Sequence, residues 1–365
     1  MFKSKLIVKD KNFYKSFFSL TSVLALQNLI VFSVNMADSI MLGRFSEQAL
    51  AGVALVNQIQ FLLQMLIVGV ADGALVFGSR AWGSKDMDTV RKITSISVKC
   101  ALVVAFVLGI TAYLLPNQIL RLLSDEIAVV NSGAEYLKII CYSYPMFAIT
   151  TTLLIALRSV EKAKIGFYVS LSTLVTNIFL NYAMIFGEFG FKPMGIKGAA
   201  YATLISRALE MIFVVLYVFL SDKTINLKLK DILSTDISLF KAYLKKGVPV
   251  FLSNGIWGVA MAAQTSILGH MGQSSITANS IASTLFQILS VVAYGSANAS
   301  SVLISKLIGE KKTDLIKPYA VTLQLLYIGI GLFTGALLFV FKDIVVSWYI
   351  ISEEARLLSL SFITI

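Results

Sequence analysis

The sequence predicts an all-α integral membrane protein whose helices form two lobes. Three observations predict this class: an apolar composition, nine apolar stretches long enough to cross a bilayer, and an internal repeat. Of the 365 residues, 57% are hydrophobic and only 14% are charged, whereas soluble domains carry about 25% charged residues. So few charged side chains cannot cover the surface of a soluble protein of this size. The composition therefore excludes an ordinary soluble enzyme, a disordered chain and a nucleic-acid-binding domain.

Nine stretches of the chain reach the length of about 20 mostly apolar residues that a membrane-spanning helix needs. Their apolar residues are continuous, as in Ala101–Leu115, and do not alternate with polar residues as they would in a membrane strand. We therefore expect nine helices, which cover residues 17–42, 50–79, 94–115, 134–157, 165–187, 195–220, 247–269, 276–304 and 319–341.

The lysine and arginine residues set the predicted orientation of these helices. The N-terminal tail and the even-numbered connections hold 22 of them, and the odd-numbered connections hold seven. Because cytoplasmic loops carry the excess of positive charge, we expect a multi-pass protein of the cell (inner) membrane with a cytoplasmic N-terminus. The net charge of +11 is then a topology signal and does not indicate a nucleic-acid partner. The expected partners are the lipid bilayer and a small amphipathic organic cation as substrate, with the chain as a monomer.

An internal repeat relates the two parts of the chain. Met41–Arg91 aligns without a gap with Ile267–Lys317, with ten identical pairs in 51 positions. The offset between the copies spans six helices, so both copies enter the membrane in the same direction, as in transporters that bind substrate between two halves. The predicted parts are a cytoplasmic tail (1–15), an N-lobe of six helices (16–220), a cytoplasmic linker (221–243) and a partial C-lobe (244–365).

The repeat also predicts how much of the C-lobe the sequence contains. Ser124–Glu126, before the fourth helix, resembles Ser352–Glu354 at nearly the same offset. We therefore expect about nine full spans plus the start of a tenth, with a second lobe that is incomplete because the sequence is truncated at its C-terminus. A genuine protein of this number of spans is the alternative.

One acidic residue stands out inside the predicted helices. Asp38 lies in the first helix, one turn after Asn35, and an ionisable residue inside a span is a functional candidate by default. Burial disfavours the charged form of a carboxyl group, so Asp38 could take up and release a proton, or it could ligate Na⁺ together with amide oxygens. The alternative is an aspartate near the extracellular end of the helix that water reaches. Its repeat counterpart is Gln264, and this one-sidedness favours an ion or proton site.

Polar side chains in other helices are candidates for the same site. Asn177 and Asn181 are four residues apart on one face of the fifth helix. Their amides can accept from a protonated carboxyl group, offer carbonyl oxygens to a cation, or form a hydrogen-bonded pair between helices. Arg207 and Glu210, three residues apart, predict a structural ion pair. The candidates for lining a cavity are Asn35, Asp72, Gln264 and Asn298, the last of which is the repeat counterpart of Asp72.

The residues that catalysis would need are scarce. A single histidine and two cysteines predict neither a disulfide framework nor most metal and acid–base sites. The sequence also lacks the clustered catalytic set that a membrane-embedded enzyme needs. We expect no enzyme activity, no cofactor, and no metal other than Na⁺ at Asp38 and Asn177.

Four segments of the chain resemble the multidrug and toxic compound extrusion (MATE) family. They are similar to the family's first-helix region, the end of its second helix, and the starts of its sixth and seventh helices, in that order. The residues that carry the resemblance are Ala37–Arg44 with Ala49–Gly52, Gly78–Asp86, Gly195–Thr203 and Gly247–Pro249.

The resemblance implies an exporter of two lobes with a V-shaped cavity, which expels organic cations, dyes or drugs in exchange for Na⁺ or H⁺. It also implies that Asp38 is the coupling acid of the first helix and that Asn177 is the asparagine beside it. Asn181 and Trp257 stand where some members carry acidic residues, and one fewer charge weakens Na⁺ binding. The first helix also lacks the proline at which some members bend.

Two alternatives to an exporter are open. A flippase for a lipid-linked oligosaccharide, from the same wider superfamily, should line its cavity with arginine or lysine to bind pyrophosphate. The ionisable residues predicted at mid-membrane are Asp38, Asp72 and the Arg207–Glu210 pair, a mildly acidic set that favours cations. The other alternative is a non-functional fragment of an exporter.

Overall fold

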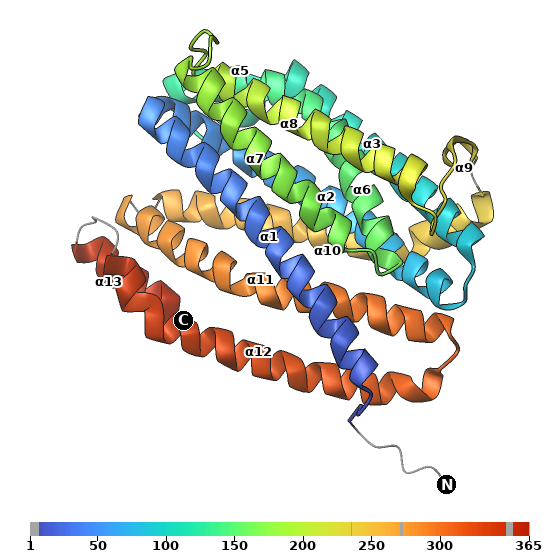
Figure 1. Ribbon diagram of the computed structural model, residues 1–365. Helices are drawn as coiled ribbons and strands as arrows, with labels where there is room; N and C mark the ends of the chain where they lie inside the picture. The colour runs from blue at the N-terminus through green and yellow to red at the C-terminus, as the bar shows by residue number, and fades with distance from the viewer. Residues whose placement is uncertain (1–6, 235, 271–272, 348–352, 365) are drawn as a thin grey trace. The chain divides into compact units, whose positions relative to one another are not determined.

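The computed structural model describes residues 7–234, 236–270, 273–347 and 353–364, and most of these residues are helical (Figure 1). This confirms the predicted all-α class. The helices are α1 (Lys11–Phe45), α2 (Glu47–Gly83), α3 (Met87–Leu114), α4 (Pro116–Arg121), α5 (Ile127–Ile140), α6 (Tyr144–Ser159), α7 (Lys164–Phe186), α8 (Ile196–Leu216), α9 (Leu229–Leu233), α10 (Ile237–His270), α11 (Gln273–Gly309), α12 (Thr313–Ser347) and α13 (Glu353–Thr364).

Eight helical segments of the described residues are long and apolar enough to cross a membrane. They are Lys11–Phe45, Gln48–Gly83, Met87–Leu114, Ile127–Ser159, Lys164–Phe186, Ile196–Ser221, Phe286–Gly309 and Thr313–Ile344. The remaining predicted span, residues 247–269, is helical as part of α10 but is not among these eight.

The fourth span departs from the single helix that its apolar run predicts. A 3₁₀ turn, Cys141–Ser143, separates α5 from α6. Pro145 follows in the first turn of α6, where a missing backbone N–H costs nothing, whereas inside a continuous helix it would remove a hydrogen bond. The proline therefore explains where the helix is interrupted.

The chain divides into two compact units, Ile30–Gly258 and Met1–Leu29 together with Val259–Ile365. The divisions fall inside α1 and α10, so each of these long helices contributes to both units. The predicted lobe boundaries at residues 220 and 244 stay predictions.

In the Ile30–Gly258 unit, α2 packs against α3, α5 and α6, and α7 pairs with α8. Small residues let these helices approach closely. A Cβ atom added to Gly52 of α2 would lie 2.7 Å from the backbone nitrogen of Gly133 in α5. A Cβ atom added to Gly198 of α8 would similarly lie against the carbonyl oxygen of Met184 in α7. These contacts hold together the helices that supply most of the candidate site.

In the other unit, α11 packs against α12 and α13. The N-terminal part of α1 belongs to the same unit, and the rings of Phe13 and Tyr319 meet edge to face with centroids 4.5 Å apart. Before α1 begins, the backbone N–H of Val8 donates to Thr322 Oγ1 at 3.0 Å. The first turns of α1 are therefore anchored on α12.

The helix boundaries follow the predicted repeat. Two helices of the first copy begin 226 residues before a later helix, the offset of the repeat, which matches α1 with α10 and α3 with α12. Lys85 and Lys311, which are also counterparts in the repeat, both adopt the left-handed conformation with φ of 59°. The two copies thus share helix boundaries and a turn conformation although few of their residues are identical.

Candidate ion-coupling site

Hydrogen bonds join the acid of α1 to α7 and α8. Asp38 lies in the part of α1 that belongs to the Ile30–Gly258 unit, and its Oδ1 accepts a hydrogen bond from Asn181 Nδ2. The same Nδ2 donates to Asn177 Oδ1 at 3.0 Å, and Asn177 Nδ2 donates to Thr203 Oγ1 at 3.4 Å. Three residues predicted from the sequence therefore lie together, and Thr203 extends them into a chain of polar groups across three helices.

Beside this chain lies a cavity of about 50 Å³, large enough for a few water molecules. Helices α1, α2, α5, α7 and α8 contribute to its wall. The polar lining residues are Asn35, Asp38, Asn57, Gln60, Tyr136, Ser170, Thr173, Asn177, Thr203, Ser206, Arg207 and Glu210. Because polar cavities hold water whereas apolar ones stay dry, this wall suits water or a small cation.

Two buried polar atoms at the site have no hydrogen-bond partner within the described residues: Asn181 Oδ1 and Gln60 Nε2. Buried polar atoms are nearly always paired with protein atoms or with ordered water, so water fits at both atoms, and only Asn181 Oδ1, as an acceptor, suits a cation. Amide, hydroxyl and carboxylate oxygens are the ligands that hard cations prefer. A cation here would depend on one carboxylate, that of Asp38, together with neutral oxygens.

The predicted ion pair forms in the wall of the same cavity. Arg207 Nη1 lies 2.8 Å from Glu210 Oε2, and the guanidinium group lies over the Phe147 ring, 5.0 Å from its centroid. Both charged residues line the cavity. Because their charges compensate each other, Asp38 is the carboxylate that lacks an ion-pair partner among the described residues of the wall.

The other sequence candidates differ in their surroundings. Asn35 lines the cavity. Asp72 does not, and its Oδ1 is buried without a hydrogen-bond partner among the described residues. Gln264 is exposed on α10, and Asn298 Nδ2 donates to the Tyr294 carbonyl oxygen of its own helix at 3.1 Å. Of the four candidates for lining a cavity, the structure brings one, Asn35, to this cavity.

Sequence reasoning missed the residues that α2 and α5 contribute. Asn57 and Gln60 line the cavity from α2, and Tyr136 lines it from α5. Asn57 and Gln60 are three residues apart in an apolar stretch, a spacing that places them on one face of a helix and that could have identified them. Tyr136 has no such signal, because a lone tyrosine in an apolar helix usually serves packing.

The helical fold, its segments long and apolar enough to span a membrane, and its polar cavity are those of a polytopic membrane protein of the transporter class. A family model described as MatE matches residues 24–183 and 249–365, which together are more than half of the chain. The chain therefore belongs to the MATE family of transporters, as the resemblance of the four segments predicts.

Relatives and solved structures agree with this membership. A probable multidrug resistance protein NorM of Listeria innocua is 27% identical over 351 residues, which cover 96% of this chain and 77% of the relative. A protein of the same description from Thermotoga maritima is 29% identical over 280 residues, which cover 77% of this chain and 60% of that relative.

A crystal structure of MATE in complex with MaL6 matches all of this chain and 80% of its own chain, with a TM-score of 0.85 and 21% identity. A MOP superfamily transporter from Pyrococcus furiosus matches all of this chain and 79% of its own, with a TM-score of 0.86 and 20% identity; at such identities the structures support the fold alone.

Proposed function

We propose that this chain is a cation-coupled antiporter that exports amphipathic organic cations, drugs or other xenobiotics by alternating access between two lobes. The observation that carries the proposal is Asp38, a carboxylate that lines a polar cavity and is hydrogen-bonded to Asn181 of another helix. The description of two relatives as multidrug resistance proteins supports drug export. In this proposal the protein lies in the cell membrane with a cytoplasmic N-terminus, acts as a monomer and needs no cofactor besides its coupling ion, H⁺ or Na⁺.

Proton coupling would act through the hydrogen bond between α1 and α7. A charged Asp38 accepts from the Asn181 amide, whereas a protonated Asp38 can itself donate, for example to the unpaired Asn181 Oδ1. Each charge state therefore favours a different hydrogen-bond arrangement between the two helices. A ligand that interacts differently with two conformations shifts their populations, and such a shift is what coupled transport requires.

Sodium coupling would use the same atoms. The Asp38 carboxylate, the Asn177 and Asn181 carbonyl oxygens and the Thr203 hydroxyl are hard oxygen ligands, and the cavity has room for water beside them. One carboxylate binds Na⁺ less tightly than two, and Asp38 is the one carboxylate of the described wall without an ion-pair partner. This single charge favours H⁺ as the coupling ion.

The flippase alternative has less support from this cavity. A pyrophosphate group would need basic side chains that are free to bind it, but Arg207 is paired with Glu210 at 2.8 Å. The solved transporter from Pyrococcus furiosus is described as having a binding pocket of reversed polarity that suggests a different function. The shared fold alone therefore does not select the substrate, and the charges of the cavity wall do.

Ethidium efflux from vesicles that contain the purified protein tests the proposal, with Na⁺ and pH gradients imposed one at a time. Asp38→Asn is the test variant, and Gln264→Asn, at the counterpart position of the second copy, is the matched control. We expect one of the two gradients, the pH gradient, to drive efflux by the wild type and by the control. The Asp38→Asn protein should insert normally and lose coupled efflux.

Normal efflux by the Asp38→Asn protein would refute the role of Asp38. Transport of a fluorescent lipid-linked sugar in place of ethidium would establish the flippase alternative. No transport of either molecule by the wild type would contradict both transport functions for this chain.

A further inference from the structure

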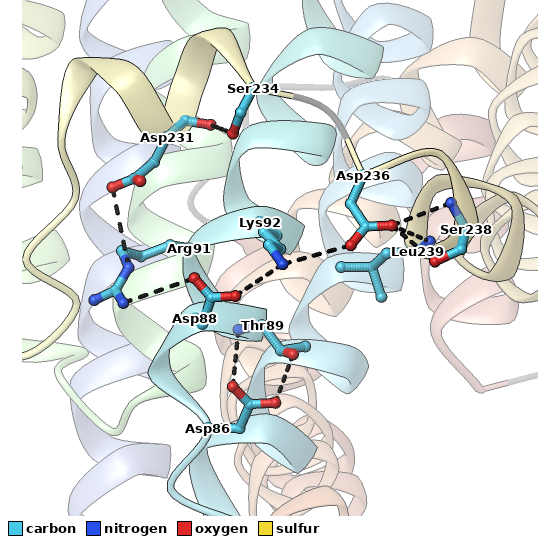
Figure 2. A network of polar contacts seen from close by, with 10 residues as sticks. All are labelled: Asp86, Asp88, Thr89, Arg91, Lys92, Asp231, Ser234, Asp236, Ser238 and Leu239. Atoms are coloured by element: carbon cyan, nitrogen blue, oxygen red, sulfur yellow. Dashed lines mark hydrogen bonds and ion pairs between the residues drawn. The ribbon is translucent and has the colours of Figure 1, made fainter.

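Ion pairs hold the segment between α8 and α10 against α3. Figure 2 shows Arg91, whose Nε lies 4.0 Å from Asp231 Oδ2, and Lys92, whose Nζ lies 3.5 Å from Asp236 Oδ2. The backbone N–H of Leu239 donates to Asp236, and this hydrogen bond helps to hold the pKa of the Asp236 carboxyl group below its usual value. The segment is therefore attached to the protein by groups that are charged at neutral pH.

Hydrogen bonds extend this attachment toward the apolar part of α3. Ser95 Oγ donates to the Ile232 carbonyl oxygen at 3.0 Å, and Lys99 Nζ donates to the Ser234 carbonyl oxygen at 2.7 Å. Residues 100–115, directly after Lys99, contain no charged side chain. Ser234, the residue that follows α9, therefore lies at the level where α3 enters the apolar part of a bilayer.

The exposed side chains of α3 support the placement of Ser234 at the edge of the apolar part of the bilayer. Val103, Val107, Ile110 and Leu114 are exposed at helical spacing, and such an apolar stripe on a membrane helix faces lipid. Lys99 lies one turn before Val103 on the same stripe. A basic side chain at the end of a lipid-facing stripe belongs at the depth of the lipid headgroups.

At this level α9 presents apolar and basic side chains to its surroundings. Leu229 and Leu233, one turn apart, are 67% and 76% exposed. Ile232 points the other way and packs against a buried core of the unit. Lys228 and Lys230 flank Leu229 and are also exposed. Exposed leucines beside lysines on a short helix are typical of a segment that lies in a membrane interface.

We propose that residues 228–233 form an interfacial anchor that binds anionic phospholipids. Leu229 and Leu233 insert at the boundary between headgroups and acyl chains, and Lys228 and Lys230 contact lipid phosphate groups. The lysines select anionic lipid, and continuity with the lipid-facing stripe of α3 selects a membrane surface over a protein partner. The inference requires that the chain spans a membrane and is independent of the proposed transport activity.

Spin labels on the full chain in vesicles test the anchor. In a background with Cys100→Ala and Cys141→Ala, a single cysteine at Leu229 or Leu233 carries the label. The matched control is Ser84→Cys, an exposed position in the turn before α3. Roughly 18 Å of helix separates the start of α3 from Lys99, which places this turn outside the bilayer. In phosphatidylcholine vesicles that contain phosphatidylglycerol, we expect both test labels to be several-fold less accessible to a water-soluble nickel chelate than the control label, and more accessible to oxygen.

Substitution of the lysines separates charge from apolar insertion. Lys228→Gln with Lys230→Gln should remove most of the protection from the nickel chelate, and omission of phosphatidylglycerol should do the same.

Two outcomes would overturn the proposal: test labels as accessible to the chelate as the control in all vesicles, or protection that neither lipid charge nor the lysines affect. Spin–spin broadening between copies of the chain would instead assign the surface to self-association and would also overturn it. Because both leucines are exposed, Leu233→Ser in the protein labelled at position 229 should leave the unfolding temperature unchanged and make the label more accessible to the nickel chelate.

Discussion

The second helices of the two repeat copies make the same kind of close contact in different units. In α2, a Cβ atom added to Gly69 would lie 2.9 Å from Phe251 Cα of α10. In α11, a Cβ atom added to Gly295 would lie 2.8 Å from the carbonyl oxygen of Thr21 in α1. Gly69 and Gly295 are counterparts in the repeat, and each contact lies inside one compact unit. The second helix of each copy therefore packs against the first helix of the other copy, at a glycine that permits the approach.

The chemistry of the first helices is not repeated in this way. Asp38 of α1 is hydrogen-bonded to Asn181 and lines a polar cavity. Its counterpart Gln264 is exposed on α10. Both copies need a close contact between helices, whereas a single ionisable group in one copy is enough for the protein to respond to an ion. The comparison indicates that a nearly symmetric scaffold carries a one-sided coupling site.

The largest expected effect comes from moving the acid between the copies. The double variant Asp38→Asn with Gln264→Asp keeps one acid in the two first helices but places it away from Asn177 and Asn181. We expect its coupled ethidium efflux to fall to background, because a carboxylate without the amides of α7 cannot change the contact between helices. Gln264→Asp alone should retain efflux. Efflux by the double variant would show that either copy can couple, and the one-sided site would be wrong.

Filling the two glycine contacts should lower the stability of both units. Gly69→Ala and Gly295→Ala each place a methyl group against backbone atoms, and such overpacking costs about 1–3 kcal/mol. The matched control is Gly329→Ala in α12, where an added Cβ meets nothing within 4 Å. This control should be stabilising by up to about 1 kcal/mol, because alanine is the better helix former.

Unfolding of the three glycine variants in detergent measures this contrast. We expect Gly69→Ala and Gly295→Ala to unfold at a lower temperature than the wild type, and Gly329→Ala to unfold at the same or a higher temperature. A higher unfolding temperature for either of the first two variants would show that the contact in that unit is loose.

A smaller effect distinguishes the turns before α3 and α12. Asp86 caps α3, with Oδ2 accepting from Thr89 Oγ1 at 2.6 Å and Oδ1 from the Thr89 backbone N–H at 3.0 Å, and these bonds lower the pKa of Asp86. Its repeat counterpart is Lys312. Lys312 Nζ lies 2.7 Å from Glu310 Oε2, which raises the pKa of the lysine.

Opposite pKa shifts predict opposite pH dependence for the two turns. A lowered aspartate pKa gives stability that is present above the unfolded value and is lost as pH falls through the native value. A raised lysine pKa gives stability that is present below the unfolded value and is lost as pH rises through the native value. Asp86→Ala should therefore lower the free energy of unfolding by about 1 kcal/mol at neutral pH, and its unfolding temperature should fall less than that of the wild type as the pH is lowered. Lys312→Gln should change the unfolding temperature only at alkaline pH. An Asp86→Ala protein whose unfolding temperature falls at acid pH as much as that of the wild type would contradict the capping role.

Several parts of the candidate site could be predicted because they depend on local spacing. Asn177 and Asn181 share a face of α7, and Arg207 reaches Glu210 at 2.8 Å, since residues three or four apart are neighbours on a helix. The spacing made Asn177 and Asn181 candidates for the site of Asp38, and the resemblance to the MATE family placed Asn177 beside that acid. The fourth span was predicted, whereas the 3₁₀ turn between α5 and α6 was not, because an apolar run by itself does not reveal how a proline is accommodated.

The sequence by itself determined the membrane class, the helical segments and the register of the repeat. In a bilayer, backbone groups have no water to bind, so an apolar run of sufficient length has to satisfy them within a helix. Only the tertiary structure decided that Gln60 and Tyr136 share a cavity with Asp38, and that α9 is held against α3. Contacts between helices that are distant in the chain depend on where the helices cross and on which side chains fit there, and the periodicity of a single helix does not encode either.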